Sequence, residues 1–93
     1  MPPELVQLVD DLVDAYDKDA HNWRNNRATT MLIGAIAGSL SREIFNQYKE
    51  EMQQRIQRGI NHRYTRAEFE TYPTPVTEHI AENAIHNIQR RIR

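Results

Sequence analysis

An uncharged stretch of fourteen residues, from Ala28 to Ser41, constrains the fold of this chain more than any other feature. Arg27 and Arg42 flank it, and elsewhere in the chain a charge is rarely more than a few residues away. As a helix the stretch would span about 21 Å, which is too short to cross a bilayer. We therefore expect it to be surrounded by protein, at the centre of the structure and of an oligomer.

Two of the chain's three glycines, Gly34 and Gly38, lie four residues apart inside this stretch. Glycines allow another backbone to approach closely. Two interpretations remain open. In the first, the pair forms a groove for the first helix of the same chain. In the second, the pair is a self-association surface, for which a two-fold axis needs only one patch. The predicted oligomer interface comprises Gly34, Gly38, Ser41 and Phe45.

The length and composition favour a small domain that is completed by a second subunit. A chain of 93 residues is expected to form a single helical domain, 1–93. A domain of this size buries only about 60–65% of the surface that its unfolded chain exposes. Only 39% of the residues are apolar, and the mean hydropathy is −0.80. The absence of cysteine excludes disulfides and thiolate metal sites.

The apolar residues recur at helical rather than strand spacing. Pro2 and Pro3 suit the start of a first helix, which we expect over residues 3 to about 24. Its apolar face is predicted to comprise Leu5, Leu8, Val9, Leu12, Tyr16 and Trp23. A second helix is expected from Ala28 or Thr29 to Arg58, with a kink at Gly38-Ser39 and with Gly59 as its C-terminal stop.

The C-terminal third is predicted to hold a short helix and a long one. Thr65 and Glu68 fit a capping box, which predicts a helix from Thr65 to about Tyr72. Thr74 is then expected to cap a last helix, with Pro75 at its first position, that runs to the C-terminus. Its apolar row is Val76, Ile80, Ala84, Ile88 and Ile92, joined by Ala81 and Ile85. The expected fold is all-α, a compact array of three main helices plus a short fourth helix, completed by oligomerisation.

Charge is distributed unevenly along the chain. Residues 1–20 carry six acidic residues against one lysine, whereas residues 54–66 carry four arginines and no acid. Nucleic-acid-binding domains are usually net basic, and this chain has a net charge of −1. The pattern therefore favours an acidic helix that faces a basic segment, either within one chain or between subunits.

Residues 61–66 are the best candidate for a ligand site outside the central stretch. They are predicted to connect two helices, and Arg63, Tyr64 and Arg66 could bind phosphate oxygens and stack on a base. The competing interpretation pairs the arginines with the acidic first helix. Arg24 and Arg27 follow Trp23, and they could line a pocket formed with a neighbouring subunit.

The inventory of catalytic and metal-binding groups is poor. Asp10, Asp14, Asp17 and His21 lie on one side of the first helix, and Glu78, Glu82 and His86 form a similar row on the last. Both rows lie opposite an apolar face, which favours solvated surfaces over metal sites. With no cysteine nucleophile, Gly-rich phosphate loop or nucleophile elbow, we predict no enzyme activity, no metal and no cofactor.

These observations predict a small accessory protein of the cytoplasm, with no secretory signal and no membrane association. Its expected function is that of a non-enzymatic adaptor or inhibitor of a macromolecular partner, with self-association through the Gly-containing helix. The alternative is a binder of a nucleotide-type ligand or nucleic acid through residues 61–66.

Overall fold

The computed structural model describes residues 1–18, 23, 26–66 and 74–93, and for residues 64–66 and 74 the backbone alone. Within these residues the chain forms four α-helices and no strand, which confirms the predicted all-α class. No helix in this part of the chain combines the length and the apolar character needed to cross a membrane. The helices are α1 (Pro3–Lys18), α2 (Arg27–Gly38), α3 (Arg42–Arg66) and α4 (Thr74–Gln89).

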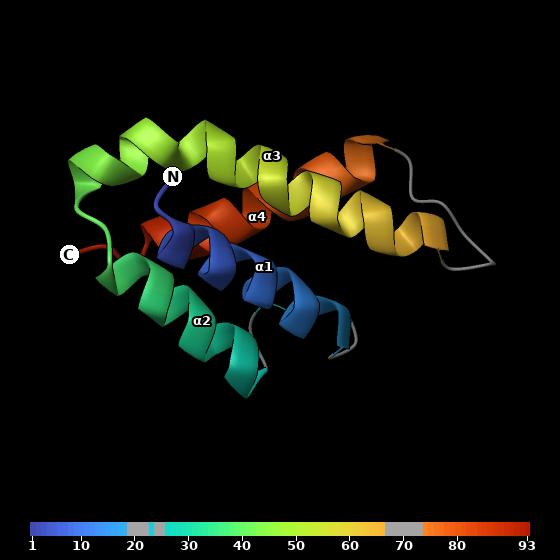
Figure 1. The fold of residues 1–93 in the computed structure, drawn as a ribbon, viewed down its shortest axis with the longest axis horizontal. Coiled ribbons are helices and arrows are strands. Elements are labelled where there is room, and N and C mark those ends of the chain that lie inside the picture. Colours follow the sequence, from blue (N-terminus) through green and yellow to red (C-terminus); the bar gives the residue numbers. More distant parts are fainter. Residues whose placement is uncertain (19–22, 24–25, 67–73) are drawn as a thin grey trace.

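The four helices form a closed ring in which each helix has two neighbours. Helix α1 packs against α2 and α3, and α4 packs against the same two helices from the other side. Successive helices run in opposite directions, so both chain termini lie at the same end of the molecule (Figure 1). Apolar side chains from all four helices meet inside this ring and form one core.

The core confirms most of the predicted apolar face of α1 and shifts that of α4. The predicted residues Leu5, Val9, Leu12 and Tyr16 are buried, together with Val13. In α4 the predicted row is displaced, because Val76 is 40% exposed and Ile80 is only partly buried. The buried positions of α4 and of the turn after it are Thr77, Ala81, Ala84, Ile85, Asn87, Ile88 and Ile92.

The predicted continuous helix from residue 28 to residue 58 is wrong, because the chain turns a corner between α2 and α3. The Ser39 hydroxyl donates to the Ile36 carbonyl at 2.8 Å, and Ser39 is the C-cap of α2. The Ser41 hydroxyl accepts the Ile44 backbone N–H at 3.2 Å, as an N-cap residue does. Leu40, between the two serines, is buried. The corner replaces one long helix with two shorter ones, whose apolar faces turn separately toward the core.

Gly59 does not stop α3, which continues to Arg66. A Cβ atom at Gly59 would lie 3.1 Å from Cγ1 of Val13, so the glycine allows a close approach between α3 and α1. Residues 61–66 are therefore the last turns of α3 and not a connector. Thr65 lies within α3, so the prediction that it starts a new helix is also wrong.

The remaining helix boundaries agree only in part with the prediction. Helix α1 is described from Pro3 to Lys18, and the predicted end near residue 24 lies outside the described residues. Helix α4 begins at Thr74 as expected, but it ends at Gln89, before the C-terminus. Residues 67–72, which were predicted to complete the short fourth helix, lie outside the described residues.

Candidate functional site

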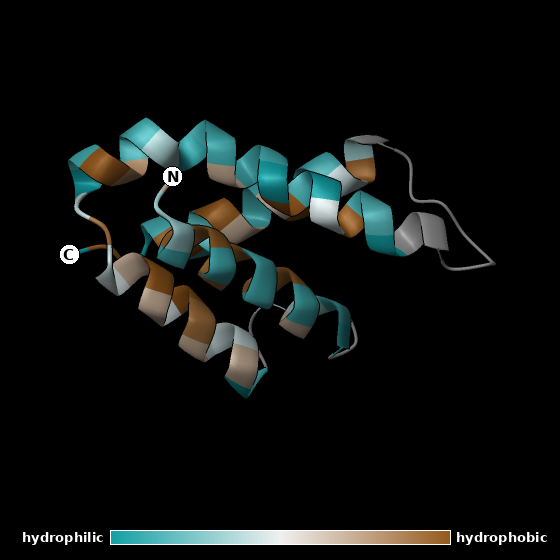
Figure 2. Ribbon diagram, in the orientation of Figure 1, coloured by the Kyte–Doolittle hydropathy of each residue, from teal (hydrophilic) through white to brown (hydrophobic). Residues whose placement is uncertain are grey.

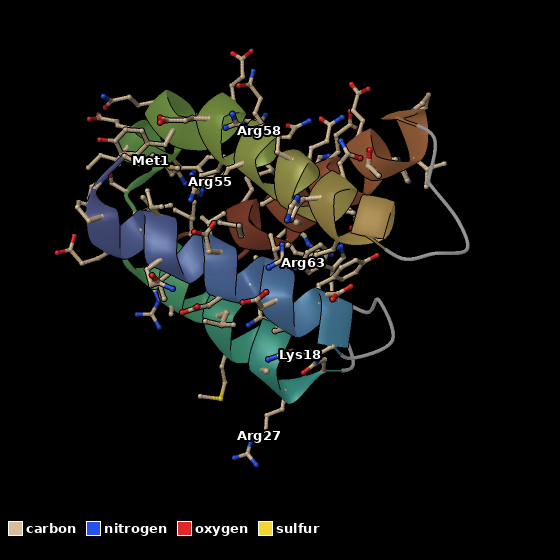
Figure 3. The ribbon with its side chains drawn as sticks, turned by 45° about the vertical axis from the view of Figure 1, so that its right-hand side comes forward. Met1, Lys18, Arg27, Arg55, Arg58 and Arg63 are labelled. Atoms are coloured by element: carbon tan, nitrogen blue, oxygen red, sulfur yellow. The ribbon has the colours of Figure 1, made fainter. Side chains whose placement is uncertain are left out.

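The arginines of the basic segment face α1. Arg55 of α3 binds the Asp10 carboxylate with both arms of its guanidinium group, Nε to Oδ1 and Nη2 to Oδ2, each at 2.8 Å. The hydrogen bond to Asp10 raises the pKa of Arg55, which therefore remains charged. Figure 3 shows Arg55 and Arg63 on the side of α3 that faces α1.

Arg63 connects α3 to α1 at a second point, nearer the C-terminal ends of both helices. Its Nη2 atom contacts the Asp14 carboxylate, and its Nη1 atom donates to the Gly59 carbonyl at 3.0 Å. The predicted match between an acidic helix and a basic segment is thus confirmed, and it occurs within one chain. Arg63 is held between two elements. The side chains of Tyr64 and Arg66, and all of Arg24, lie outside the described residues.

The acidic row of α1 gives no metal site in the part of the chain that the structure describes. No group of three or more His, Asp or Glu side chains there could hold a metal ion. Asp10 and Asp14 are paired with arginines of α3. His21 lies outside the described residues.

Helix α2 presents an uncharged face to the outside of the molecule. This outer face of α2 comprises Ala28, Met31, Ala35 and Gly38, which are all exposed. Met31 is 66% exposed, the highest value among the exposed large hydrophobic side chains that the structure describes. Hydrophobic colouring runs along most of α2, whereas much of α1 and α3 has hydrophilic colouring (Figure 2). The opposite face of the same helix supplies Thr29, Ile33, Ile36 and Ala37 to the interior.

The two glycines of α2 do not form a groove for α1, so that interpretation is wrong. A Cβ atom at Gly38 would meet nothing within 4 Å. A Cβ atom at Gly34 would lie 3.8 Å from Nη1 of Arg91, a residue that follows α4. Of the other two predicted interface residues, Ser41 is exposed, whereas Phe45 is only 2% exposed and packs in the core of its own chain. The interface itself stays a prediction.

Arg27 stands at the N-terminal end of the outer face of α2. Its side chain is exposed and points away from the body of the molecule (Figure 3). No hydrogen bond or ion pair joins it to another described residue. The predicted role of Arg27 in a pocket formed with a neighbouring subunit stays a prediction.

A cleft of about 460 Å³ collects residues that the sequence analysis did not single out as a site. It is lined by Trp23, which precedes α2, by Ile33 of α2, by Asn87 of α4, and by Arg90 and Arg91 in the turn after α4. The available signal was the adjacent Arg90 and Arg91, with no acidic residue after Glu82. Their proximity to Trp23 depends on the packing of α4 against α2.

Comparisons of the chain with protein-family models, curated proteins and solved structures found no match.

Proposed function

We propose that this chain is a non-enzymatic binding protein that associates with a second copy of itself through the outer face of α2. The exposure of Met31 on a face that lacks charge supports this proposal most strongly. Such a face can be covered without removing any charged group from water, so the main cost of burying polar surface is avoided. Function as an adaptor or inhibitor would then depend on contact with a protein partner and not on chemistry.

The spacing of the outer face favours a second copy as its occupant. Ala28, Met31, Ala35 and Gly38 are separated by three, four and three residues, so their order of spacings is the same in both chain directions. When two α2 helices pack antiparallel, Met31 of each copy faces Ala35 of the other. Ala28 then faces Gly38. Large residues meet small ones across a two-fold axis, as a self-complementary interface requires.

Arg27 adds electrostatic support for the antiparallel arrangement. In that arrangement it lies near the C-terminal end of α2 in the second copy, where the helix dipole is negative. Helix α2 has no basic residue in its own last turn. The second copy thus supplies the cation that favours this helix end.

The size of the surface determines how stable the dimer can be. Helix α2 has 12 residues, which corresponds to a length of about 18 Å. An interface formed by one helix of this length buries less surface than the about 800 Å² per partner of a standard interface. We therefore expect a reversible dimer whose population rises with protein concentration.

Sedimentation equilibrium over a range of micromolar to millimolar concentrations tests the proposal. The apparent mass of the wild type should rise from 11.0 kDa toward twice that value. Met31→Glu should keep the mass at that of the monomer, because it places a charge in the interface. Val76→Glu is the matched control, since it adds the same charge at an exposed hydrophobic residue of α4. Equal association by both variants, or a monomeric wild type at the highest concentration, contradicts the proposal.

Binding of a nucleotide or nucleic acid through residues 61–66 stays a prediction. No contact of the described residues favours such binding. Of the three candidate side chains, Arg63, Tyr64 and Arg66, the first is already paired with Asp14.

A further inference from the structure

The cleft beside Trp23 has the composition of a ligand site. Trp23 and Ile33 form an apolar wall, and Asn87, Arg90 and Arg91 form a polar one. No acidic residue is among these lining residues. A volume of about 460 Å³ falls within the range of about 300–1,000 Å³ that small-molecule pockets occupy.

The apolar wall is held in place by contacts on two sides. The Trp23 ring stacks on Tyr16 of α1, with ring centroids 3.9 Å apart and an interplanar angle of 20°. The Thr29 hydroxyl donates to the Trp23 carbonyl at 2.9 Å. Asn26 caps α2 by accepting the Ala28 N–H at 2.8 Å, and its amide donates to the Ala15 carbonyl of α1 at 3.3 Å. The indole is therefore fixed before any ligand arrives.

Asn87 carries a hydrogen-bond donor for which the described part of the chain offers no acceptor. The residue is only 6% exposed. Its Oδ1 atom accepts a hydrogen bond from Nη2 of Arg90, so the amide group is oriented and Nδ2 lies on its other side. Nδ2 is buried and has no hydrogen-bond partner among the residues that the structure describes. Unpaired buried donors are rare in folded proteins, because they lose their water without compensation. An acceptor brought by a ligand would remove this deficit.

The two arginines supply positive charge next to this donor. Both side chains are exposed, and neither pairs with a carboxylate of the described residues. Nη1 of Arg91 donates to the Thr30 carbonyl of α2 at 3.3 Å, which holds its guanidinium group across the edge of α2. The polar wall thus offers donors from three side chains. The ligand that matches it is an anion.

We propose that this cleft binds a small organic carboxylate with a flat apolar body. The carboxylate accepts hydrogen bonds from Nδ2 of Asn87 and from the Arg91 guanidinium group, and the apolar body lies against Trp23 and Ile33 where they line the cleft. A fully hydrated inorganic anion would gain no apolar contact with Trp23 and Ile33. An organic acid therefore matches the cleft better than free phosphate does. The site does not include the outer face of α2, so it is independent of self-association.

Trp23 is the chain's only tryptophan, so its fluorescence reports on the cleft directly. Titration with benzoate should change its emission saturably and should shift the Asn87 side-chain amide signal in a ¹H–¹⁵N NMR spectrum. Benzamide, which has the same ring without the charge, should bind at least tenfold more weakly. Inorganic phosphate should also bind at least tenfold more weakly than benzoate. Equal binding of phosphate and benzoate overturns the role of the apolar wall.

Variants identify the groups that bind. Arg91→Gln and Asn87→Asp should each weaken benzoate binding at least tenfold, because one removes the charge and the other replaces the donor with an acceptor. Arg93→Gln, which removes a nearby exposed charge outside the cleft, should bind as the wild type does. Circular dichroism verifies that each variant is folded, and the exposed position of Arg91 provides a test that does not depend on the buried Asn87. Equal binding by all variants, or no saturable binding to the wild type, overturns the proposal.

Discussion

At the scale of single residues, the three glycines of this chain have three different surroundings. Gly59 lies against Val13, where a Cβ atom would be 3.1 Å from a methyl group. Gly34 lies under the Arg91 side chain, and Gly38 faces open space. The glycine with the closest contact is thus the one outside the uncharged stretch, because α1 and α3 approach each other closely at Gly59.

We expect Gly59→Leu to destabilise the monomer and Gly38→Leu to leave it unchanged. The new side chain at Gly59 would collide with Val13 and displace Arg63, and overpacking of this kind typically costs about 1–3 kcal/mol. The check is the free energy of unfolding in urea at low micromolar protein concentration, where self-association is minor. Equal losses of stability in the two variants would show that Gly59 is not a close-contact position.

At the scale of elements, two ion pairs tie α3 to α1, at Arg55–Asp10 and Arg63–Asp14. They lie at the edge of the contact between the helices, and the paired side chains of Arg55 and Asp10 are 38% and 43% exposed. Solvent therefore reduces the energy of these pairs, although Arg55 binds Asp10 with good two-armed geometry. Their main effect is to align the two helices, since each acidic residue meets its own arginine.

A double-mutant cycle with Arg55→Gln and Asp10→Asn should give a coupling free energy of about 0–1 kcal/mol, as is usual for exposed pairs. The coupling should fall as salt is raised, because ions screen surface charges. The Arg55 pKa is raised by its hydrogen bond to Asp10, so the guanidinium group keeps its charge, and the pair persists, as the pH is raised toward that pKa. Raising the pH from 7 to about 10 should therefore leave the coupling unchanged, since an arginine stays protonated there. A coupling that disappears over this range contradicts the assignment to Arg55.

At the scale of the whole molecule, the ring of four helices closes around one core. Because of this, the adjacent residues Ile44 and Phe45 differ strongly in exposure. Phe45 is 2% exposed, whereas Ile44, the residue before it, is 42% exposed. The sequence placed Phe45 in an oligomer interface, but its side chain is already covered within one chain. Removing it should therefore affect folding of the monomer.

Phe45→Ala should lower the free energy of unfolding by about 3–5 kcal/mol, the usual cost of truncating a buried phenylalanine. Such a loss is a large part of the about 5–15 kcal/mol that stabilises a typical domain. Ile44→Ala should cost well below this amount, because its side chain remains partly in water. Denaturant unfolding of both variants at the same low concentration makes the comparison. If Phe45→Ala changed only the oligomeric state and not the stability of the monomer, its assignment to the core would be wrong.

Some features of this protein follow from local sequence alone. The all-α class and the buried face of α1 depend on the spacing of residues such as Leu5, Val9 and Leu12, which one helix brings together. The start of α4 follows from Thr74 and Pro75, which are neighbours in the chain. The complementary charges of residues 1–20 and 54–66 were also visible without a structure, although not that they pair within one chain.

The tertiary structure decided the features that depend on residues far apart in the chain. The corner at Ser39–Ser41 exists because α2 and α3 must each turn an apolar face toward the same core. The helical spacing of residues 28–58 does not reveal this corner, because it depends on contacts with the other helices. The role of Gly59 requires Val13, and the cleft requires Trp23 to meet Asn87 and Arg91. Sequence spacing determines what lies on one face of a helix, because the helix repeat is fixed. Which faces meet is set by packing of the whole chain, and only the folded molecule shows it.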